Sequence, residues 1–208
     1  MLVEKTVQGF TEELASESPA PGGGSVAALA GSIAASLVSM VSNLTVGKEK
    51  YQEYEDELKE VLEEAQGLRK KLLQLVDDDT DAFNRVMAAF KMPKETDEDK
   101  RIRSQAIQKA FVGAAELPLG VAKCCLQAMK LSEKVIDNGN PNAASDAGVS
   151  VLMAGAGAKA AALNVEINLG AIKDEAKKKE LKESLDGVMQ AICELEKKLL
   201  EKVKEKIN

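Results

Sequence analysis

Apolar residues recur along this chain with the spacing of α-helices, and no segment shows the two-residue alternation of a β-strand. The clearest helical pattern runs from Tyr51 to Phe90, where one side is apolar except at Asp79, and Pro93 ends the segment. Similar patterns occupy about residues 3–14, 96–135 and 174–207. The sequence therefore predicts an all-α protein, a single domain spanning residues 1–208, with five to six long helices.

Two further segments, Ser25–Val46 and Asn142–Ile172, are rich in alanine and glycine rather than in large apolar residues. The first lies in a stretch, residues 18–47, that carries no charge, although 30% of the whole chain is charged. Each glycine inside a helix costs up to about 1 kcal/mol relative to alanine, and close helix packing would offset that cost. We therefore expect these two helices to be the innermost ones. A membrane span is the alternative for Ser25–Val46, but serines recur along it and no basic anchor flanks it.

Composition limits the class of function. The formal net charge of −6 argues against a nucleic-acid partner. Cys124, Cys125 and Cys193 are odd in number and lack the spacing of metal ligands, so we expect reduced, buried thiols in a cytoplasmic protein without a secretory signal. The chain has no histidine. Acid–base chemistry near neutral pH would therefore need carboxylates, lysines, tyrosines or the substrate itself.

A glycine-rich turn, Pro21-Gly22-Gly23-Gly24-Ser25, precedes the first small-residue helix. The free amides at a helix N-terminus can hold an anion, so this turn is a candidate binding element. The alternative is structural, namely a helix start that needs a thin backbone. Lys48 follows the other end of the same helix, just after Gly47.

Carboxylate and amide side chains provide further candidates. Asp79 interrupts the apolar side of the 51–90 helix, and because an unpaired buried carboxylate costs several kcal/mol, it needs a partner or a role. Asp146 begins the second small-residue helix, either as a cap or as a site residue, and Asn164 and Asn168 share its face. The acidic run around Asp79 lacks the spacing of a calcium loop, so no metal site is expected.

Several short motifs occur together in a specific order. They are Ser18-Pro-Ala-Pro-Gly-Gly-Gly-Ser25, Thr45-Val-Gly-Lys48, Leu75-Val-Asp-Asp-Asp79-Thr-Asp-Ala-Phe83, Met92-Pro-Lys94, Ser145-Asp146 and Asn164-Val-Glu-Ile-Asn168-Leu169. In this order they resemble the cyclodeaminase domain of formiminotransferase-cyclodeaminase and the related stand-alone methenyltetrahydrofolate cyclohydrolases, over essentially the whole chain. The resemblance implies an all-helical homodimer, a one-carbon derivative of tetrahydrofolate as substrate, and no metal or redox cofactor.

The resemblance leaves two reactions open. In the first, formiminotetrahydrofolate cyclises to methenyltetrahydrofolate and ammonia leaves; in the alternative, water opens the methenyl bridge to formyltetrahydrofolate. A non-catalytic helical scaffold or regulatory dimer is a further alternative. We expect folate to bind where the glycine-rich turn, Lys48 and the Asp146 region meet. The expected catalytic residues are Asp146 as proton shuttle, then Asp79 and Lys48; the expected substrate-binding residues are Pro21, Gly22, Gly23, Gly24, Ser25, Asn164 and Asn168.

Overall fold

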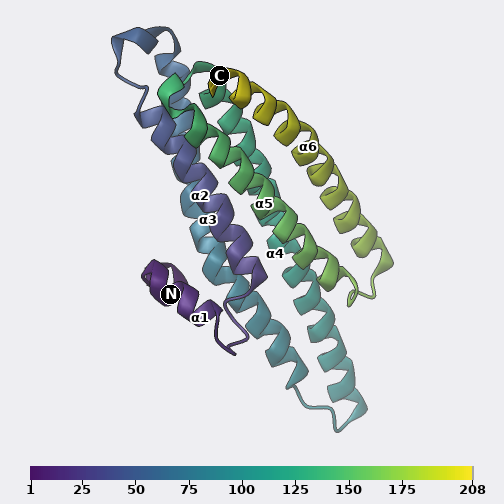
Figure 1. Ribbon diagram of the computed structural model, residues 1–208. Coiled ribbons are helices and arrows are strands. Elements are labelled where there is room, and N and C mark those ends of the chain that lie inside the picture. The colour runs from purple at the N-terminus through teal and green to yellow at the C-terminus, as the bar shows by residue number, and fades with distance from the viewer. Residues whose placement is uncertain (208) are drawn as a thin grey trace.

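The computed structural model describes residues 1–207, which contain six α-helices and, within that range, no β-strand (Figure 1). The all-α fold predicted from the apolar spacing is confirmed. The helices are α1 (Val7–Leu14), α2 (Gly23–Asn43), α3 (Glu55–Phe90), α4 (Asp97–Asn138), α5 (Ala144–Leu169) and α6 (Glu175–Ile207), with short 3-10 turns η1 (Leu2–Glu4), η2 (Glu49–Tyr54) and η3 (Pro141–Ala143).

Polar side chains begin two of the long helices. At α4, the hydroxyl of Thr96 accepts the N–H of Asp99 at 3.0 Å, and the Asp99 carboxylate accepts the N–H of Thr96, which makes a capping box. At α6, the Asp174 carboxylate accepts the N–H of Lys177 at 3.0 Å. The sequence predicted both helix starts correctly.

Other helix boundaries differ from the prediction by a few residues. The first small-residue helix, expected at Ser25–Val46, runs from Gly23 to Asn43, and hydrogen-bonded turns lead from there to Gly47, whose φ of 78° turns the chain. The residues expected to begin the third and fifth helices form the 3-10 turns η2 and η3 instead.

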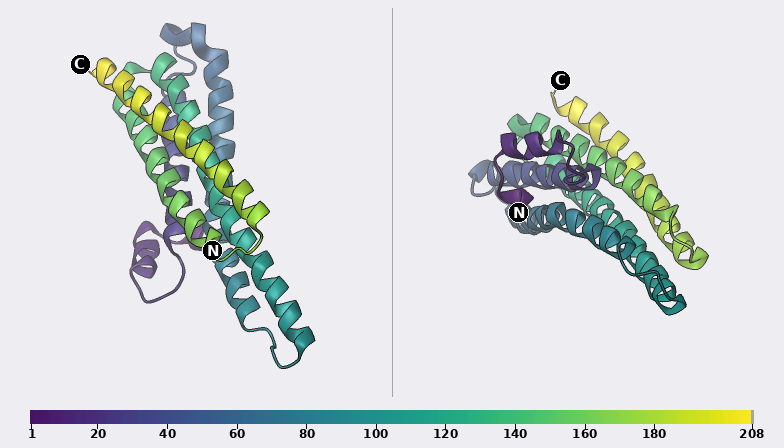
Figure 2. Two further views of the ribbon diagram at one scale, coloured as in Figure 1. Left: turned by 90° about the vertical axis from the view of Figure 1, so that its right-hand side faces the viewer. Right: turned by 90° about the horizontal axis from the view of Figure 1, so that it is seen from below.

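Five helices form the bundle, and the N-terminal segment lies outside it. α4 packs against α2, α3, α5 and α6, so it is the helix in contact with every other long helix. Figure 1 shows α2 and α5 side by side with α4 behind them, and both views of Figure 2 show α1 outside the five-helix bundle. The two small-residue helices have a larger share of buried residues than α4, whose buried residues begin at Ala115, but both also carry exposed residues, so the prediction that they are innermost is only partly right.

Glycine allows α2 and α5 to pack closely. A Cβ atom at Gly157 would lie 2.9 Å from the carbonyl oxygen of Ala27 and 3.1 Å from the amide nitrogen of Gly31, so a larger residue would push the two backbones apart. The helices are antiparallel: Gly23 lies beside Asn164 at one end, and Thr45 hydrogen-bonds the loop before α5 at the other. The beginning of α2 therefore meets the end of α5.

One side of the α2–α5 pair remains exposed and apolar. Exposed apolar side chains recur at helical spacing on both helices, and we call these positions the α2/α5 face: Ile33 and Met40 from α2, Leu44 directly after it, and Val149, Leu152, Leu163 and Ile167 from α5. α2 and the segment Pro141–Leu169 are each long and apolar enough to span a membrane, but 61% and 56% of their apolar windows are buried inside the bundle. Helix packing thus accounts for much of their composition.

The core is aliphatic, with many alanines, and none of the cysteines forms a disulfide within the described residues. Cys124 and Cys125 lie buried on α4, as expected for structural thiols, and burial raises the pKa of Cys125 to about 12. Cys193 is exposed, so the prediction that all three thiols are buried is wrong for this residue. It lies on the solvent side of α6, where no core contact requires a cysteine.

Candidate active site

The N-terminus of α2 meets α3 at the glycine-rich turn. The carboxylate of Asp79 lies directly against this turn, where it accepts a hydrogen bond from the hydroxyl of Ser25 at 3.0 Å. A Cβ atom at Gly24 would overlap the carboxylate, lying 2.6 Å from its Cγ and closer still to Oδ1. The glycine therefore makes room for Asp79, and the anion at this helix start is a side chain of the protein itself.

Asp79 has an unusual electrostatic environment. Desolvation by burial raises the pKa of its carboxyl group, while hydrogen bonds from the side chain and backbone of Ser25 lower it; the net effect is a raised pKa. A carboxyl group with a raised pKa can exchange protons closer to neutral pH than an ordinary aspartate. In a protein without histidine, this property singles out Asp79 as an acid–base candidate.

A cavity of about 370 Å³ opens beside Asp79. This volume falls in the range of small-ligand sites, roughly 300–1,000 Å³. Asp79 is the only ionisable side chain among the described residues that line it. The lining residues are Pro19, Ala20, Gly22, Gly23, Gly24, Asp79, Thr80, Ala82, Phe83, Val86, Phe111, Ala114, Asn164, Ile167 and Asn168.

Asn164 and Asn168 lie one turn apart near the end of α5 and both line this cavity. The side-chain amide of Asn164 donates to the carbonyl of Ala160 at 2.9 Å. That of Asn168 donates to the carbonyl of Ala114 on α4 at 3.0 Å and to the carbonyl of Asn164 at 2.7 Å. Because backbone carbonyls take these donors, the side-chain oxygens are the groups that each asparagine has left to accept hydrogen bonds from a ligand.

The structure brings together most of the predicted binding residues. Gly22, Gly23 and Gly24 line the cavity, and Ser25 reaches it through its bond to Asp79. Pro21 is buried behind the turn. Their roles in binding stay predictions.

Lys48 and Asp146 lie elsewhere. Lys48 follows the C-terminal end of α2, and Asp146 lies in the first turn of α5, whose preceding loop bonds to that same end of α2 through Asn140 and Thr45. With a rise of 1.5 Å per residue, α2 places this end about 30 Å from the glycine-rich turn. The prediction that the turn, Lys48 and Asp146 meet is therefore wrong within one chain.

The aromatic residues of the cavity were not among the site residues predicted from the sequence. Phe83 and Phe111 line it, from α3 and α4. Phe83 lies four residues after Asp79, one helical turn away, so helical spacing alone could have predicted that Phe83 lies close to Asp79. Nothing in the sequence marked Phe111, because its position depends on how α4 packs against α3.

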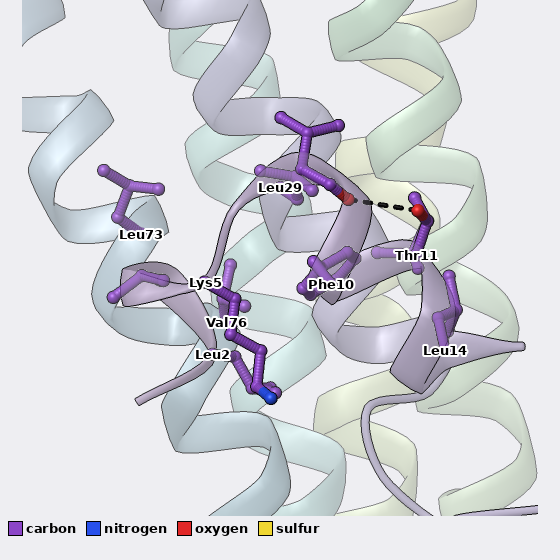
Figure 3. Close-up of a pocket in the computed structure, with 11 residues that line it drawn as sticks. Leu2, Lys5, Phe10, Thr11, Leu14, Leu29, Leu73 and Val76 are labelled. Atoms are coloured by element: carbon purple, nitrogen blue, oxygen red, sulfur yellow. Dashed lines mark hydrogen bonds between the residues drawn. The ribbon is translucent and has the colours of Figure 1, made fainter. Parts of the chain in front are cut away.

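A second cavity, of about 410 Å³, lies under the N-terminal segment (Figure 3). Apolar side chains such as Phe10, Leu29 and Val76 dominate its lining. Among the described residues that line it, the ammonium of Lys5 is the only ionisable group, and it pairs with Glu13 at 3.1 Å. Thr11, the one hydroxyl among the lining residues, donates to the carbonyl of Val7 at 3.0 Å. This cavity therefore offers no free group for acid–base chemistry.

Residues 1–207 contain no cluster of three or more potential metal-ligating His, Cys, Asp or Glu side chains. The groups beside the cavity are instead one carboxyl, two amide oxygens, the first amides of a helix and an apolar wall. This arrangement suits a ligand with hydrogen-bond donors at one end and an apolar ring elsewhere.

Comparison with known proteins gives consistent matches over this fold. The family described as formiminotransferase-cyclodeaminase matches residues 6–187. A methenyltetrahydrofolate cyclohydrolase of Methylorubrum extorquens is 44% identical over 208 residues, the full length of both chains. The formimidoyltransferase-cyclodeaminase of Sus scrofa is 32% identical over 189 residues, and the match spans 91% of this chain but 35% of that longer protein.

A solved structure agrees with these sequence matches. The crystal structure of formiminotetrahydrofolate cyclodeaminase from Thermotoga maritima superposes with a TM-score of 0.90 and covers 100% of both chains, at 28% identity. The two proteins therefore share the whole helical architecture, including the helices that build the cavity.

Proposed function

This chain belongs to the formiminotransferase-cyclodeaminase family of folate one-carbon enzymes, and we propose that it opens and closes the methenyl bridge of tetrahydrofolate at the cavity beside Asp79. One observation supports this location above others. The cavity combines a carboxyl group of raised pKa with free carbonyl acceptors and an apolar wall. These groups match a reaction that needs proton transfer next to a cationic one-carbon centre.

The chemistry of both candidate reactions fits a single carboxylate. In the hydrolytic direction, water adds to the methenyl carbon and gives its proton to Asp79; the carbon–nitrogen bond of the adduct then breaks as the proton returns to the departing nitrogen. In the deaminating reaction, the second folate nitrogen attacks the carbon of the protonated formimino group; Asp79 takes the proton of that nitrogen and passes it to the amino group, which leaves as ammonia and leaves the methenyl cation. Both pass through a tetrahedral adduct at the one-carbon unit, and both have the methenyl cation at one end of the reaction, where the ionised carboxylate of Asp79 stabilises the positive charge electrostatically.

We favour the cyclohydrolase reaction as the first candidate, because the cyclohydrolase of Methylorubrum extorquens is 44% identical over its full length. The cyclodeaminase reaction is the first of the two reactions expected from the sequence. It remains the second candidate, because two of the matched proteins are named for it. They are the formiminotetrahydrofolate cyclodeaminase of Thermotoga maritima, at 28% identity, and the formimidoyltransferase-cyclodeaminase of Sus scrofa, at 32% identity.

Ultraviolet absorbance tests the proposal directly. Methenyltetrahydrofolate has a distinctive absorbance band, which the enzyme should remove by hydrolysis or create from formiminotetrahydrofolate. We expect faster loss of the band with the wild-type protein than with buffer or with Asp79→Asn. If a folded wild-type protein accelerates neither reaction, the proposed function is wrong.

We also propose that the protein acts as a homodimer through the α2/α5 face. This surface is apolar along two adjacent helices, and monomeric proteins rarely leave such contiguous surfaces in water. A second copy is the occupant favoured by the family resemblance, and a two-fold interface would pair the face with itself.

An antiparallel arrangement of the two faces would also place Lys48 and Asp146 of one copy over the cavity of its partner. These residues lie at the far end of the same α2–α5 pair that lines the cavity. The arrangement would bring a cationic and a second carboxylate side chain to the substrate. We further propose a cytoplasmic location, which suits a protein with three free cysteines.

A further inference from the structure

The residues that line the cavity beside Asp79 form two sets of different chemistry. The polar set contains Asp79, the side chains of Asn164 and Asn168, and the first amides of α2 at Gly23 and Gly24. Each of these groups can form a directional hydrogen bond. A ligand part rich in donors and acceptors would therefore bind to this set.

The second set is aromatic and aliphatic. Phe83 and Phe111 line it together with Val86 and Ile167. The chain has only four phenylalanines and no tryptophan, so half of its phenylalanines lie at this one cavity. The side chain of Phe83 is 37% exposed, so the protein itself leaves much of this ring uncovered.

The structure holds the two rings in defined positions. Phe111 packs edge-to-face against Phe90, with ring centroids 5.9 Å apart and an interplanar angle of 78°. Phe83 stands one turn from Asp79 on the same helix, so α3 fixes the spacing between the carboxyl group and the ring. Ala82 and Ala114 also line the cavity, and their small side chains leave space beside the rings.

We infer that Phe83 and Phe111 hold the p-aminobenzoyl ring of the folate and so determine how the substrate is oriented. This inference rests on the proposed function. A folate has a pterin rich in hydrogen-bond donors, a benzene ring without donors on its faces, and the reacting carbon between them. With the pterin on the asparagine oxygens and the benzene ring on the phenylalanines, the reacting carbon lies beside Asp79.

Two binding probes test this orientation. One is 5-formyltetrahydrofolate, which carries both the pterin and the p-aminobenzoyl ring; the other is 6-methyltetrahydropterin, which lacks that ring. Phe83→Leu should raise the Kd of the folate roughly 3- to 10-fold, the loss expected for one aromatic contact, and leave the Kd of the pterin unchanged. Asn164→Ala, which removes one of the polar lining side chains, should raise both dissociation constants.

Matched controls separate a local effect from a general one. Phe83→Tyr keeps the aromatic face and should bind the folate like wild type, and Phe10→Leu makes the same change in the other cavity, away from Asp79. Thermal melting checks that each variant is folded. The inference is wrong if Phe83→Leu weakens neither probe, or weakens both equally, in a protein whose wild type is active. If the wild type neither binds nor converts folate, the proposed function fails first and the orientation fails with it.

Discussion

Ser25 donates its hydroxyl to Asp79 across 54 residues of sequence, at 3.0 Å from Oγ to Oδ2. The same hydroxyl lies 3.0 Å from the carbonyl oxygen of Val76, so it links α2 to both a side chain and the backbone of α3. The bond lowers the pKa of Asp79, although burial raises that pKa by more. Ser25 therefore limits how far the pKa of Asp79 rises above that of an ordinary aspartate, and Asp79 is the only ionisable side chain among the described residues that line its cavity.

Ser25→Ala should shift the pH dependence of catalysis. Loss of the hydroxyl removes a hydrogen bond to the charged carboxylate, so the pKa of Asp79 rises further. If Asp79 acts as a base, the acidic limb of the kcat/KM profile moves to higher pH. We also expect a stability loss of about 1 kcal/mol.

A matched control for this change is Ser36→Ala. The hydroxyl of Ser36 bonds only the carbonyl of Ser32 in its own helix, at 2.8 Å, so the profile should stay in place. An acidic limb that is unmoved, or that moves to lower pH, in Ser25→Ala would contradict a role for Asp79 as the base.

Gly24→Ala should damage the site, whereas Gly22→Ala should not. A Cβ atom at Gly24 would overlap the Asp79 carboxylate, but at Gly22 nothing lies within 4 Å. Overpacking of this kind costs about 1–3 kcal/mol and would displace the carboxylate. We expect Gly24→Ala to melt at lower temperature and to lose about 100-fold in kcat, the low end of what acid–base catalysis supplies.

Gly22→Ala should keep both its melting temperature and its activity. Gly23→Ala is intermediate, because its Cβ atom would sit in ordinary contact, 3.4 Å from the amide nitrogen of Asn164. Equal effects at Gly22 and Gly24 would show that the turn needs glycine for its backbone rather than for the carboxylate.

The sequence predicted the fold better than the site because helices are local and cavities are not. Helical spacing located the long helices, and the break in that spacing at Asp79 correctly indicated a carboxylate that needs a partner. The partner itself, Ser25, required the packing of α2 against α3. The position of Asp146 relative to the glycine-rich turn depended on the antiparallel course of α5, which the spacing could not reveal. Phe111 was missed for the same reason.

Asp79→Asn should stabilise the protein at neutral pH. Because the pKa of Asp79 is raised in the folded state, the folded protein binds this proton more tightly than the unfolded chain. This tighter proton binding adds fully to the free energy of unfolding at pH values below 3.8, the ordinary pKa of an aspartate. The added stability is lost as the pH rises through the raised pKa of Asp79 in the folded state. Asparagine removes this pH dependence and can still accept a hydrogen bond from Ser25.

Melting temperatures of wild type and Asp79→Asn, measured as a function of pH, test whether the substitution stabilises or destabilises the protein. The difference between Asp79→Asn and wild type should be largest at neutral pH and shrink towards pH 3.8. Asp81→Asn, an exposed position on the same helix, serves as the control and should change little. A variant that is less stable than wild type at neutral pH would mean that the charged carboxylate stabilises the fold.

Leu152→Glu should disrupt the proposed dimer. The Leu152 side chain is 49% exposed near the middle of α5 on the α2/α5 face, and a charge buried there without a partner is unfavourable. Sedimentation should show a dimer for wild type at micromolar concentration and a monomer for the variant. Ile102→Glu, at an exposed apolar position on α4 outside that face, should remain dimeric. A wild-type monomer would exclude this interface.

Mixed dimers should show whether two copies share one site. We expect Asp79→Asn and Asp146→Asn each to lower turnover by at least about 100-fold, as for loss of a proton-transfer group. If Asp146 of one copy serves the cavity of its partner, a dimer of one Asp79→Asn chain with one Asp146→Asn chain has one cavity with both carboxylates and one with neither. Such a dimer, purified through a different tag on each chain, should recover about half of wild-type turnover, because two-fold symmetry gives each dimer two sites.

If both single variants are inactive and the mixed dimer is too, the two carboxylates act within one chain or Asp146 is needed for another purpose. If the single variant Asp146→Asn keeps near-normal turnover, Asp146 is not needed for catalysis and Asp79 is the proton shuttle.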